Sequence, residues 1–408
     1  MIEKAKQILL RYSNLIPPTV LGPEKVAFLA DKMREMPAEE KIVLHGLMNY
    51  ILTVMVEKEA SDVEVGGFGT AGSIWFRIHG NKDRFTDLPI LSTEEASVLI
   101  LSLLTLNQIK HLLVSRNLDF SYTFRYEKLN KYLRFRADTY FDLDSLALNM
   151  RAISSLIRPL DSLEFHLNAV RSMSHNFIKF GLSLVTGITG SGKSATLDSI
   201  IDYHNNFDPC HIVIISSPIE YVHSSKKSLI RHREVGRDVL SFKEGVIQAL
   251  RQDPDIIVIG EMRDPDTIMA ALEVTDTGHK VFSTLHTSSA TESIDRIIAE
   301  VNPIEQERVR NRLADVLITV VSQKLVPTTD GKRTLAKEVL IVTPSVKAAI
   351  KNNNTSEIYM MLVQGGGQGM MTMEQDLLRL LQQKRITQET ALTFANNKTR
   401  MLQLLKGS

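Results

Sequence analysis

Eight residues near the middle of the chain place three glycines and two serines around a single lysine. Residues 187–194 read Gly-Ile-Thr-Gly-Ser-Gly-Lys-Ser, and an apolar run over 182–186 comes directly before them. Glycines let backbone N–H groups approach an anion without a Cβ in the way, and the lysine adds a positive charge. A helix that follows aims its positive end at the same place. The pattern therefore predicts a loop that binds phosphate groups between a strand and a helix.

We expect this loop to bind ATP together with Mg²⁺. Lys193 would contact the outer phosphates, and the hydroxyl of Ser194 would be a ligand of Mg²⁺. The rest of the loop would surround the phosphates with its backbone, through Gly187, Thr189, Gly190, Ser191, Gly192 and Ala195. The alternative is a glycine-rich turn with an incidental lysine, and the apolar strand before the loop argues against it.

A carboxylate follows a second strongly apolar run. Residues 255–261 read Asp-Ile-Ile-Val-Ile-Gly-Glu, which predicts a buried strand that ends beside Glu261. Ligands of open α/β sheets bind at the carboxyl ends of the strands. We therefore predict that Glu261 lies near the Mg²⁺ and acts as a general base or orients the attacking water. The alternative is a surface acid at a strand end.

Strands and helices alternate in the second part of the chain, which favours a parallel sheet covered by helices. The predicted strands cover residues 182–186, 211–216, 256–260, 280–285 and 337–342. Before residue 160 the pattern is that of a small α+β domain. It predicts helices at 38–60 and 93–108 and strands at 62–65, 73–78, 120–126, 132–139 and 146–153. The predicted division is a helical N-terminal extension over 1–37, a domain over 38–160 and a domain over 161–408.

Composition limits the class of protein. Apolar residues make up 43% and charged residues 23% of 408 residues, as in globular proteins. Because 48 Lys and Arg nearly balance 47 Asp and Glu, no global positive field attracts nucleic acid, and we expect no nucleic-acid partner. Cys210 is the single cysteine, which excludes internal disulfides and paired-cysteine zinc sites and fits a reducing cytoplasm. The most apolar stretch, 97–106, is too short to span a bilayer.

Several further blocks follow the phosphate loop in a recognisable order. They cover residues 218–223, 233–236, 249–264, 277–287 and 293–297. In order and spacing they resemble the Asp box, the Walker B motif and the His box of the secretion and pilus motor ATPases. This resemblance covers residues 186 to about 302.

Within that superfamily the chain is most similar to the PilT-type retraction ATPases. Assembly and secretion members usually carry a further N-terminal domain and a four-cysteine zinc module, for which this chain has neither the length nor the cysteines. Residues 342–351 resemble a C-terminal helix of the retraction enzymes, and 60–62, 119–122 and 134–136 resemble their PAS-like N-terminal domain.

The resemblance implies a RecA-like P-loop ATPase domain preceded by a PAS-like α+β domain. It implies a homohexameric motor that retracts a type IV pilus through ATP-driven domain movements. Such a motor would be cytoplasmic, at the inner face of the cytoplasmic membrane, and would act on an inner-membrane pilus platform protein. A type II secretion or pilus-extension ATPase remains the alternative.

The resemblance also assigns roles to histidines and arginines. His279 and His286 would be the His-box pair at the nucleotide, with a satisfied structural histidine as the alternative for His286. Arg251, Arg263 and Arg296 would stabilise transition-state charge, and Arg136 and Arg151 would reach the nucleotide from the N-terminal domain. The alternative for each of these five arginines is an ordinary surface ion pair.

Two departures from the family pattern bear on turnover. The Asp box ordinarily reads Glu-Asp-Pro, whereas this chain has Ser216 and Ser217 before Pro218. A serine cannot carry the charge that orients Mg²⁺ or accepts a proton. Ile247 also replaces an arginine. We therefore predict slow hydrolysis, or dependence on a paralogous ATPase in a mixed ring, unless Glu220 turns inward to supply a carboxylate.

Overall fold

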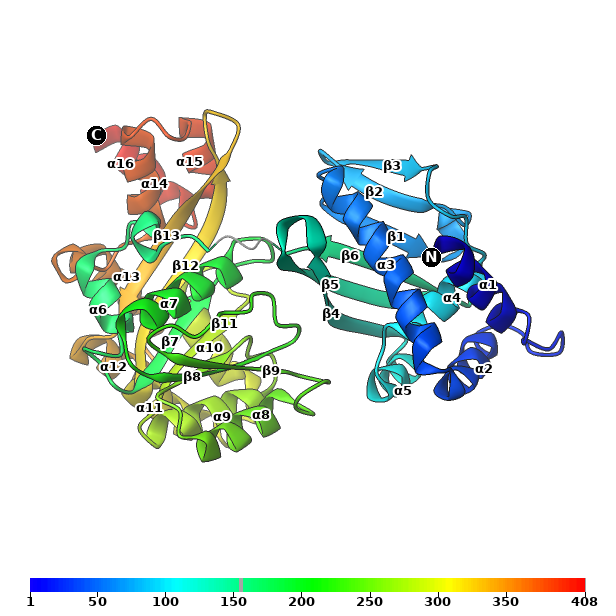
Figure 1. Cartoon of the computed structure of the whole chain (residues 1–408). Coiled ribbons are helices and arrows are strands. Elements are labelled where there is room, and N and C mark those ends of the chain that lie inside the picture. The colour runs from blue at the N-terminus through cyan, green and yellow to red at the C-terminus, as the bar shows by residue number, and fades with distance from the viewer. Residues whose placement is uncertain (154–156, 408) are drawn as a thin grey trace. The chain divides into compact units, whose positions relative to one another are not determined.

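The computed structural model describes residues 1–153 and 157–407, and the chain forms two compact units (Figure 1). The N-terminal unit contains Met1–Ser155 and two short later segments, Ser217–Tyr221 and Gly236–Asp238. The C-terminal unit contains Leu156–Ser216, Val222–Val235 and Val239–Ser408.

A six-stranded antiparallel sheet forms the centre of the N-terminal unit, in the order β3-β2-β1-β6-β5-β4. Its strands are β1 (Asp62–Gly66), β2 (Ile74–Ile78), β3 (Asn81–Phe85), β4 (Asn117–Tyr126), β5 (Lys131–Asp142) and β6 (Ser145–Ala152). The helices of this unit are α1 (Ile2–Ser13), α2 (Glu24–Lys32), α3 (Ala38–Glu57), α4 (Thr93–Ser102) and α5 (Leu106–Ser115). The predicted α+β pattern is confirmed, and β3 is a strand that the sequence did not predict.

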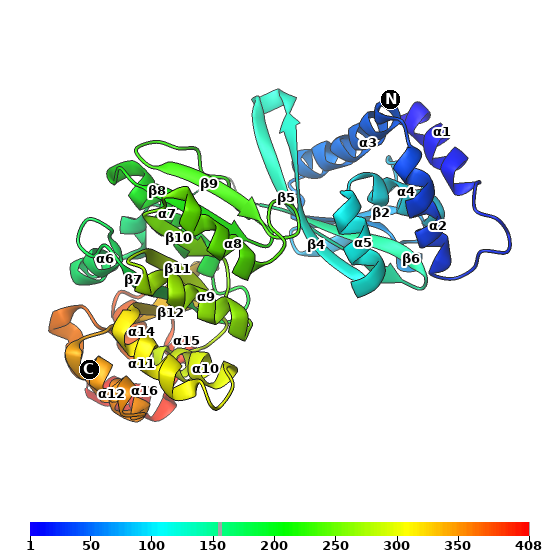
Figure 2. The ribbon, with the colours of Figure 1, turned by 90° about the horizontal axis from the view of Figure 1, so that it is seen from below.

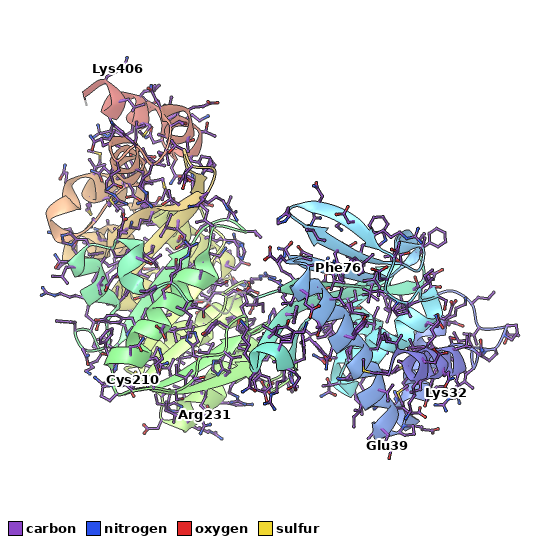
Figure 3. The ribbon with its side chains drawn as sticks, turned by 45° about the horizontal axis from the view of Figure 1, so that its top comes forward. Lys32, Glu39, Phe76, Cys210, Arg231 and Lys406 are labelled. Atoms are coloured by element: carbon purple, nitrogen blue, oxygen red, sulfur yellow. The ribbon has the colours of Figure 1, made fainter. Side chains whose placement is uncertain are left out.

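The first two helices belong to the core of this unit. Leu9 of α1 and Leu29 of α2 are buried in one hydrophobic cluster with Leu44 of α3 and Phe76 of β2, the last of which is labelled in Figure 3. The sequence-based division placed residues 1–37 in an extension of their own. In the structure they share one core with the sheet, because the apolar faces of α1 and α2 pack against α3 and α4.

The helix predicted over 93–108 is two helices. Ser92 begins α4 with a capping box to Glu95, and Thr105 begins α5 with a second capping box to Gln108. Each cap satisfies backbone N–H groups that a helix start leaves without partners. The second cap therefore starts a new helix inside the predicted one.

The C-terminal unit is built on a seven-stranded sheet in the order β13-β12-β7-β11-β10-β8-β9. All neighbours are parallel except β12 and β13. The strands are β7 (Gly181–Thr186), β8 (His211–Ser216), β9 (Leu229–Glu234), β10 (Ile256–Ile259), β11 (Lys280–Leu285), β12 (Leu317–Pro327) and β13 (Arg333–Ile341). The five predicted strands are confirmed, with shifted ends at β13, while β9 and β12 were missed.

Helices cover this sheet, and every residue of β7 and β11 is buried. The covering helices are α6 (Leu167–Met173), α7 (Lys193–Phe207), α8 (Phe242–Ala249), α9 (Pro265–Asp276), α10 (Ala290–Glu300) and α11 (Gln306–Val316). Figure 2, a view from below, shows α8 and α9 in front of the strands. Among the described residues, no helix combines the length and the apolar composition needed to cross a membrane.

The remaining helices follow β13. They are α12 (Pro344–Lys351), α13 (Thr355–Gln364), α14 (Met373–Gln382), α15 (Gln388–Phe394) and α16 (Lys398–Gly407). The last three pack around a small core that contains Met373, Leu377 and Met401, at the end of the long β12–β13 pair (Figure 1). Thr372 and Gln375 form a capping box at the start of α14.

Candidate nucleotide site

The loop between β7 and α7 has a backbone that requires glycine. Gly187 and Gly192 have φ angles of 152° and 89°, a region that side chains disfavour. A Cβ at Gly187 would lie 2.4 Å from the hydroxyl of Ser191 and 2.5 Å from the carbonyl oxygen of Gln323. The glycines therefore allow the loop to turn tightly between the strand and the helix, as predicted.

Neighbouring strands hold this loop in place. The backbone N–H of Gly187 donates to the carbonyl of Leu285 at the end of β11, over 3.2 Å. The side-chain amide of Gln323 on β12 donates to the carbonyl of Ser191 over 2.8 Å. Sequence reasoning missed Gln323 because it missed β12, which follows α11 without a turn signal.

Lys193 lies over the loop that it is expected to serve. It is 9% exposed, and its Nζ donates to the carbonyls of Gly187 and Ile188 over 2.8 and 3.2 Å. The loop therefore folds around the ammonium group of Lys193. Ser194 and Ala195 follow in the first turn of α7 and are exposed, so the hydroxyl of Ser194 is accessible to a metal ion beside a bound phosphate.

Three parallel strands end together beside this loop. Thr186 of β7 pairs with Leu285 of β11, and Ile259 of β10 pairs with Ser283 of β11. Glu261 and His286, which follow β10 and β11, therefore come to the same edge of the sheet. Their side chains approach within 3.8 Å, measured from Oε2 of Glu261 to Nε2 of His286.

Two arginines complete this cluster. The Nε of Arg263 lies 2.8 Å from Oε2 of Glu261, and Nη1 of Arg296 donates to the carbonyl of His286 over 3.1 Å. The pKa of His286 is lowered by its burial and by the positive charges of Lys193, Arg263 and Arg296. The imidazole is therefore neutral at pH 7, with one nitrogen able to donate and the other to accept.

Two of the predicted site residues, His279 and Arg251, lie at the other edge of the sheet from the P-loop of their own chain. His279 precedes β11, and Lys280 pairs with Gly181 at the start of β7, so His279 lies at the opposite edge of the sheet from His286. Six strand residues separate the two histidines by about 20 Å. Arg251 lies in a short 3₁₀ helix (Leu250–Gln252) before β10, at that same opposite edge, and is exposed.

The two predicted arginines of the N-terminal unit have partners within that unit. Arg151 forms an ion pair of 2.7 Å with Asp62. Arg136 lies 3.4 Å from Asp119 and 3.8 Å from Glu220, which is grouped with this unit. The carboxylate of Glu220 thus faces an arginine, and the contact of Arg136 and Arg151 with a nucleotide stays a prediction.

A buried acid lies beside the serines of the Asp box. Ser216 ends β8 directly opposite Glu234, the last residue of β9, so their side chains lie on the same face at the carboxyl edge. Glu234 is 4% exposed. A Cβ on Gly260 would lie 2.4 Å from the hydroxyl of Ser216, so this hydroxyl packs directly against the residue before Glu261. Glu234 lies in the sequence block 233–236. Its position beside Ser216 depends on β9, a strand that the sequence did not predict.

The fold and this edge define a P-loop nucleotide-binding protein with an acid and a neutral histidine beside the loop. Residues 37–403 match the family described as Type II/IV secretion system protein, and the chain belongs to that family.

Individual relatives sharpen the comparison. The sequence is 37% identical over 373 residues to a twitching motility protein of Neisseria gonorrhoeae, spanning 91% of this chain and 96% of that protein. It is 38% identical over 315 residues to the type IV pilus retraction ATPase PilT of Pseudomonas aeruginosa, spanning 77% and 89%. A crystal structure of the pilus retraction motor PilT with bound ADP has a TM-score of 0.75 at 35% identity and covers 86% of this chain and 98% of that chain. The predicted resemblance and fold class are confirmed.

Proposed function

We propose that this protein hydrolyses ATP to drive the retraction of a type IV pilus. The observation that carries the proposal is the convergence of Lys193, Glu261 and His286 on one sheet edge. The names of the relatives, a twitching motility protein and pilus retraction ATPases, support the same function.

The chemistry follows from this cluster. The loop N–H groups and Lys193 bind the phosphates of ATP, and Ser194 would supply a hydroxyl ligand to Mg²⁺, which would neutralise phosphate charge. Glu261 orients a water molecule whose oxygen attacks the γ-phosphorus. The bond from that phosphorus to the bridging oxygen of ADP breaks, and the proton of the water passes to Glu261 or to the released phosphate.

His286 and the arginines take the remaining roles. A neutral His286 donates a hydrogen bond to the γ-phosphate or to Glu261, so it responds when that phosphate leaves. Arg263 and Arg296 supply positive charge where negative charge develops in the transition state. Hydrolysis then moves the two units of the chain, because the contacts of the γ-phosphate favour one conformation over another.

The motor acts as a homohexameric ring. The position of Arg251 supports this assembly, since an exposed arginine far from the P-loop of its own chain is free to serve the nucleotide of a second copy. Mixing Arg251→Ala with Glu261→Gln subunits tests this. Restored hydrolysis in the mixture supports action across a subunit boundary, and no restoration contradicts it.

Slow turnover is the second part of the proposal. Ser216 and Ser217 stand where the family has acids, which supports weak hydrolysis or a need for a paralogous ATPase, with Glu234 as the remaining buried carboxylate. The variant Ser216→Glu/Ser217→Asp is expected to raise ATP turnover about tenfold. The control is Ser216→Ala/Ser217→Ala, which adds no acid. Unchanged turnover in the acidic variant contradicts the idea.

The cellular function is tested by deleting the gene and scoring pilus retraction. We expect pili to assemble but not retract, with rescue by the wild-type gene and none by Lys193→Ala. Loss of assembly or of protein secretion instead would favour an extension or secretion ATPase. The expected partner is an inner-membrane pilus platform protein, which co-purification after crosslinking checks.

A further inference from the structure

A cavity of about 350 Å³ lies beside β13 in the C-terminal unit. Lys337 and Val339 of β13 line it, together with His166, which precedes α6, and Met370 and Met371, which precede α14. At roughly 30 Å³ per water molecule, this space corresponds to about twelve waters, enough for a small organic molecule. None of these residues belongs to the nucleotide site around the P-loop, Glu261 and His286.

Lys337 is the unusual residue of this cavity. Its side chain is 1% exposed, yet among the described residues Nζ has no hydrogen-bond acceptor. The nearest carboxylate oxygen, Oδ2 of Asp376, lies 3.9 Å away, and the ring of Phe165 is centred 5.5 Å away. Burial lowers the pKa of Lys337, against the opposing effect of Asp376. A buried ammonium is costly unless hydrogen bonds satisfy it, so the donors of Lys337 remain available to a ligand.

The surrounding charges leave an excess of one positive charge. Asp376 accepts a hydrogen bond from the backbone of Lys337 and another from Arg379, both over 2.8 Å. Glu164 pairs with Arg379 and with Arg385. Three cations therefore face two carboxylates, and both carboxylates already have arginine partners. An anion is the ligand that would balance this group.

The remaining residues that line the cavity indicate which other chemical groups the ligand carries. The Nδ1 of His166 accepts a hydrogen bond from the backbone of Asn168 over 3.2 Å, so in the neutral ring Nε2 carries the proton and is a donor. Val339, Met370 and Met371 add apolar surface. Methionines adapt to ligands of different shape. The cavity thus combines two donors with an apolar wall.

We propose that this cavity binds a small organic monoanion, with a carboxylate held by Lys337 and His166 and an apolar body against Val339, Met370 and Met371. The site is separate from the P-loop. The cavity is nevertheless close to the P-loop in the sheet. Lys337 pairs directly with Gln323, whose side-chain amide donates a hydrogen bond to the carbonyl of Ser191.

Three matched probes test the proposal on the full chain: hexanoate, hexan-1-ol and hexylammonium. Each is titrated at constant ionic strength with Mg²⁺ and saturating ADP, so that the nucleotide site is occupied. Binding is followed by saturation-transfer NMR and by the melting temperature. We expect hexanoate to bind saturably, with a dissociation constant about tenfold below those of the other two probes.

Variants assign the binding to the cavity. Lys337→Gln is expected to weaken the binding of hexanoate about tenfold. The control Lys332→Gln, which changes an exposed lysine of the β12–β13 turn, should leave this binding unchanged.

Equal binding of all three probes, no saturable binding of hexanoate, or unchanged binding in Lys337→Gln would each overturn the proposal. Equal competition by inorganic phosphate would overturn the part that requires an apolar body. If Lys337→Gln and Lys337→Met both fail to fold, the ranking of the probes on the wild type decides.

Discussion

The two ends of β11 carry similar residues with different environments. At the carboxyl end, His286 lies beside Glu261 and the P-loop and keeps a third of its side chain exposed. At the amino end, Nδ1 of His279 lies 3.0 Å from the hydroxyl of Thr277, and Lys280 is buried and donates to the carbonyls of Ser172 and Ile178. One short segment thus reaches from the candidate nucleotide site at one end to the buried core at the other.

The direction of the strands explains this difference. In a parallel sheet all carboxyl ends meet at one edge, where loops leave the strands and a ligand can approach. Charged groups there remain partly exposed and face each other across neighbouring strands. At the amino edge the chain enters from covering helices, so Lys280 is enclosed and its pKa is lowered to about 7, chiefly by burial. We therefore expect the carboxyl end to control turnover and the amino end to control stability.

The largest expected effect is at Glu261. Glu261→Gln keeps the size of the side chain but removes its charge and its capacity to take a proton, so ATP turnover should fall by about 100-fold or more. Nucleotide affinity should change little, because Lys193 and the loop remain. Phosphate release and binding of a fluorescent ADP analogue measure the two quantities. Turnover within about twofold of wild type would remove Glu261 from the mechanism.

The two histidines test the comparison most directly. His286→Ala should lower turnover about tenfold, since it removes a hydrogen bond to a charged group. His279→Ala, a matched change next to the opposite end of β11, should stay within about twofold of wild type. The ATPase rates of both variants, with melting temperatures to exclude unfolding, decide the matter. Equal losses of ATP turnover in the two variants would mean that the edge of the sheet at which a histidine lies does not determine its effect on turnover.

Lys280 should affect stability in a pH-dependent way. The unfolded lysine has a pKa near 10.5 and the folded one near 7, so between these values the unfolded chain binds more protons. The free energy of unfolding contributed by Lys280 should therefore rise with pH above 7, by about 1 kcal/mol per pH unit. Lys280→Met should remove this rise.

Urea denaturation of wild type and Lys280→Met at pH 7, 8 and 9 measures the effect. Lys332→Met, which changes an exposed lysine, should keep the wild-type slope. Parallel pH dependence in wild type and Lys280→Met would show that Lys280 keeps its proton when folded.

Local patterns in the sequence determined much of this protein. The P-loop, the strands that lead to Glu261 and His286, and the capping box at Thr372 all depend on residues close together in the chain. A turn that needs glycine or a helix start that needs a cap can be read from a few neighbouring residues. The resemblance to the retraction ATPases depends on the same short blocks and their spacing.

Only the tertiary structure decided which of these residues meet. It separated His279 and Arg251 from the P-loop, and it brought in Gln323 from a strand more than a hundred residues away. It also joined residues 1–37 to the core of the N-terminal unit and placed Glu234 beside Ser216. The physical reason is that strand order and direction, set by burial across the whole sheet, determine which strand ends share an edge. Spacing along the chain does not contain that information.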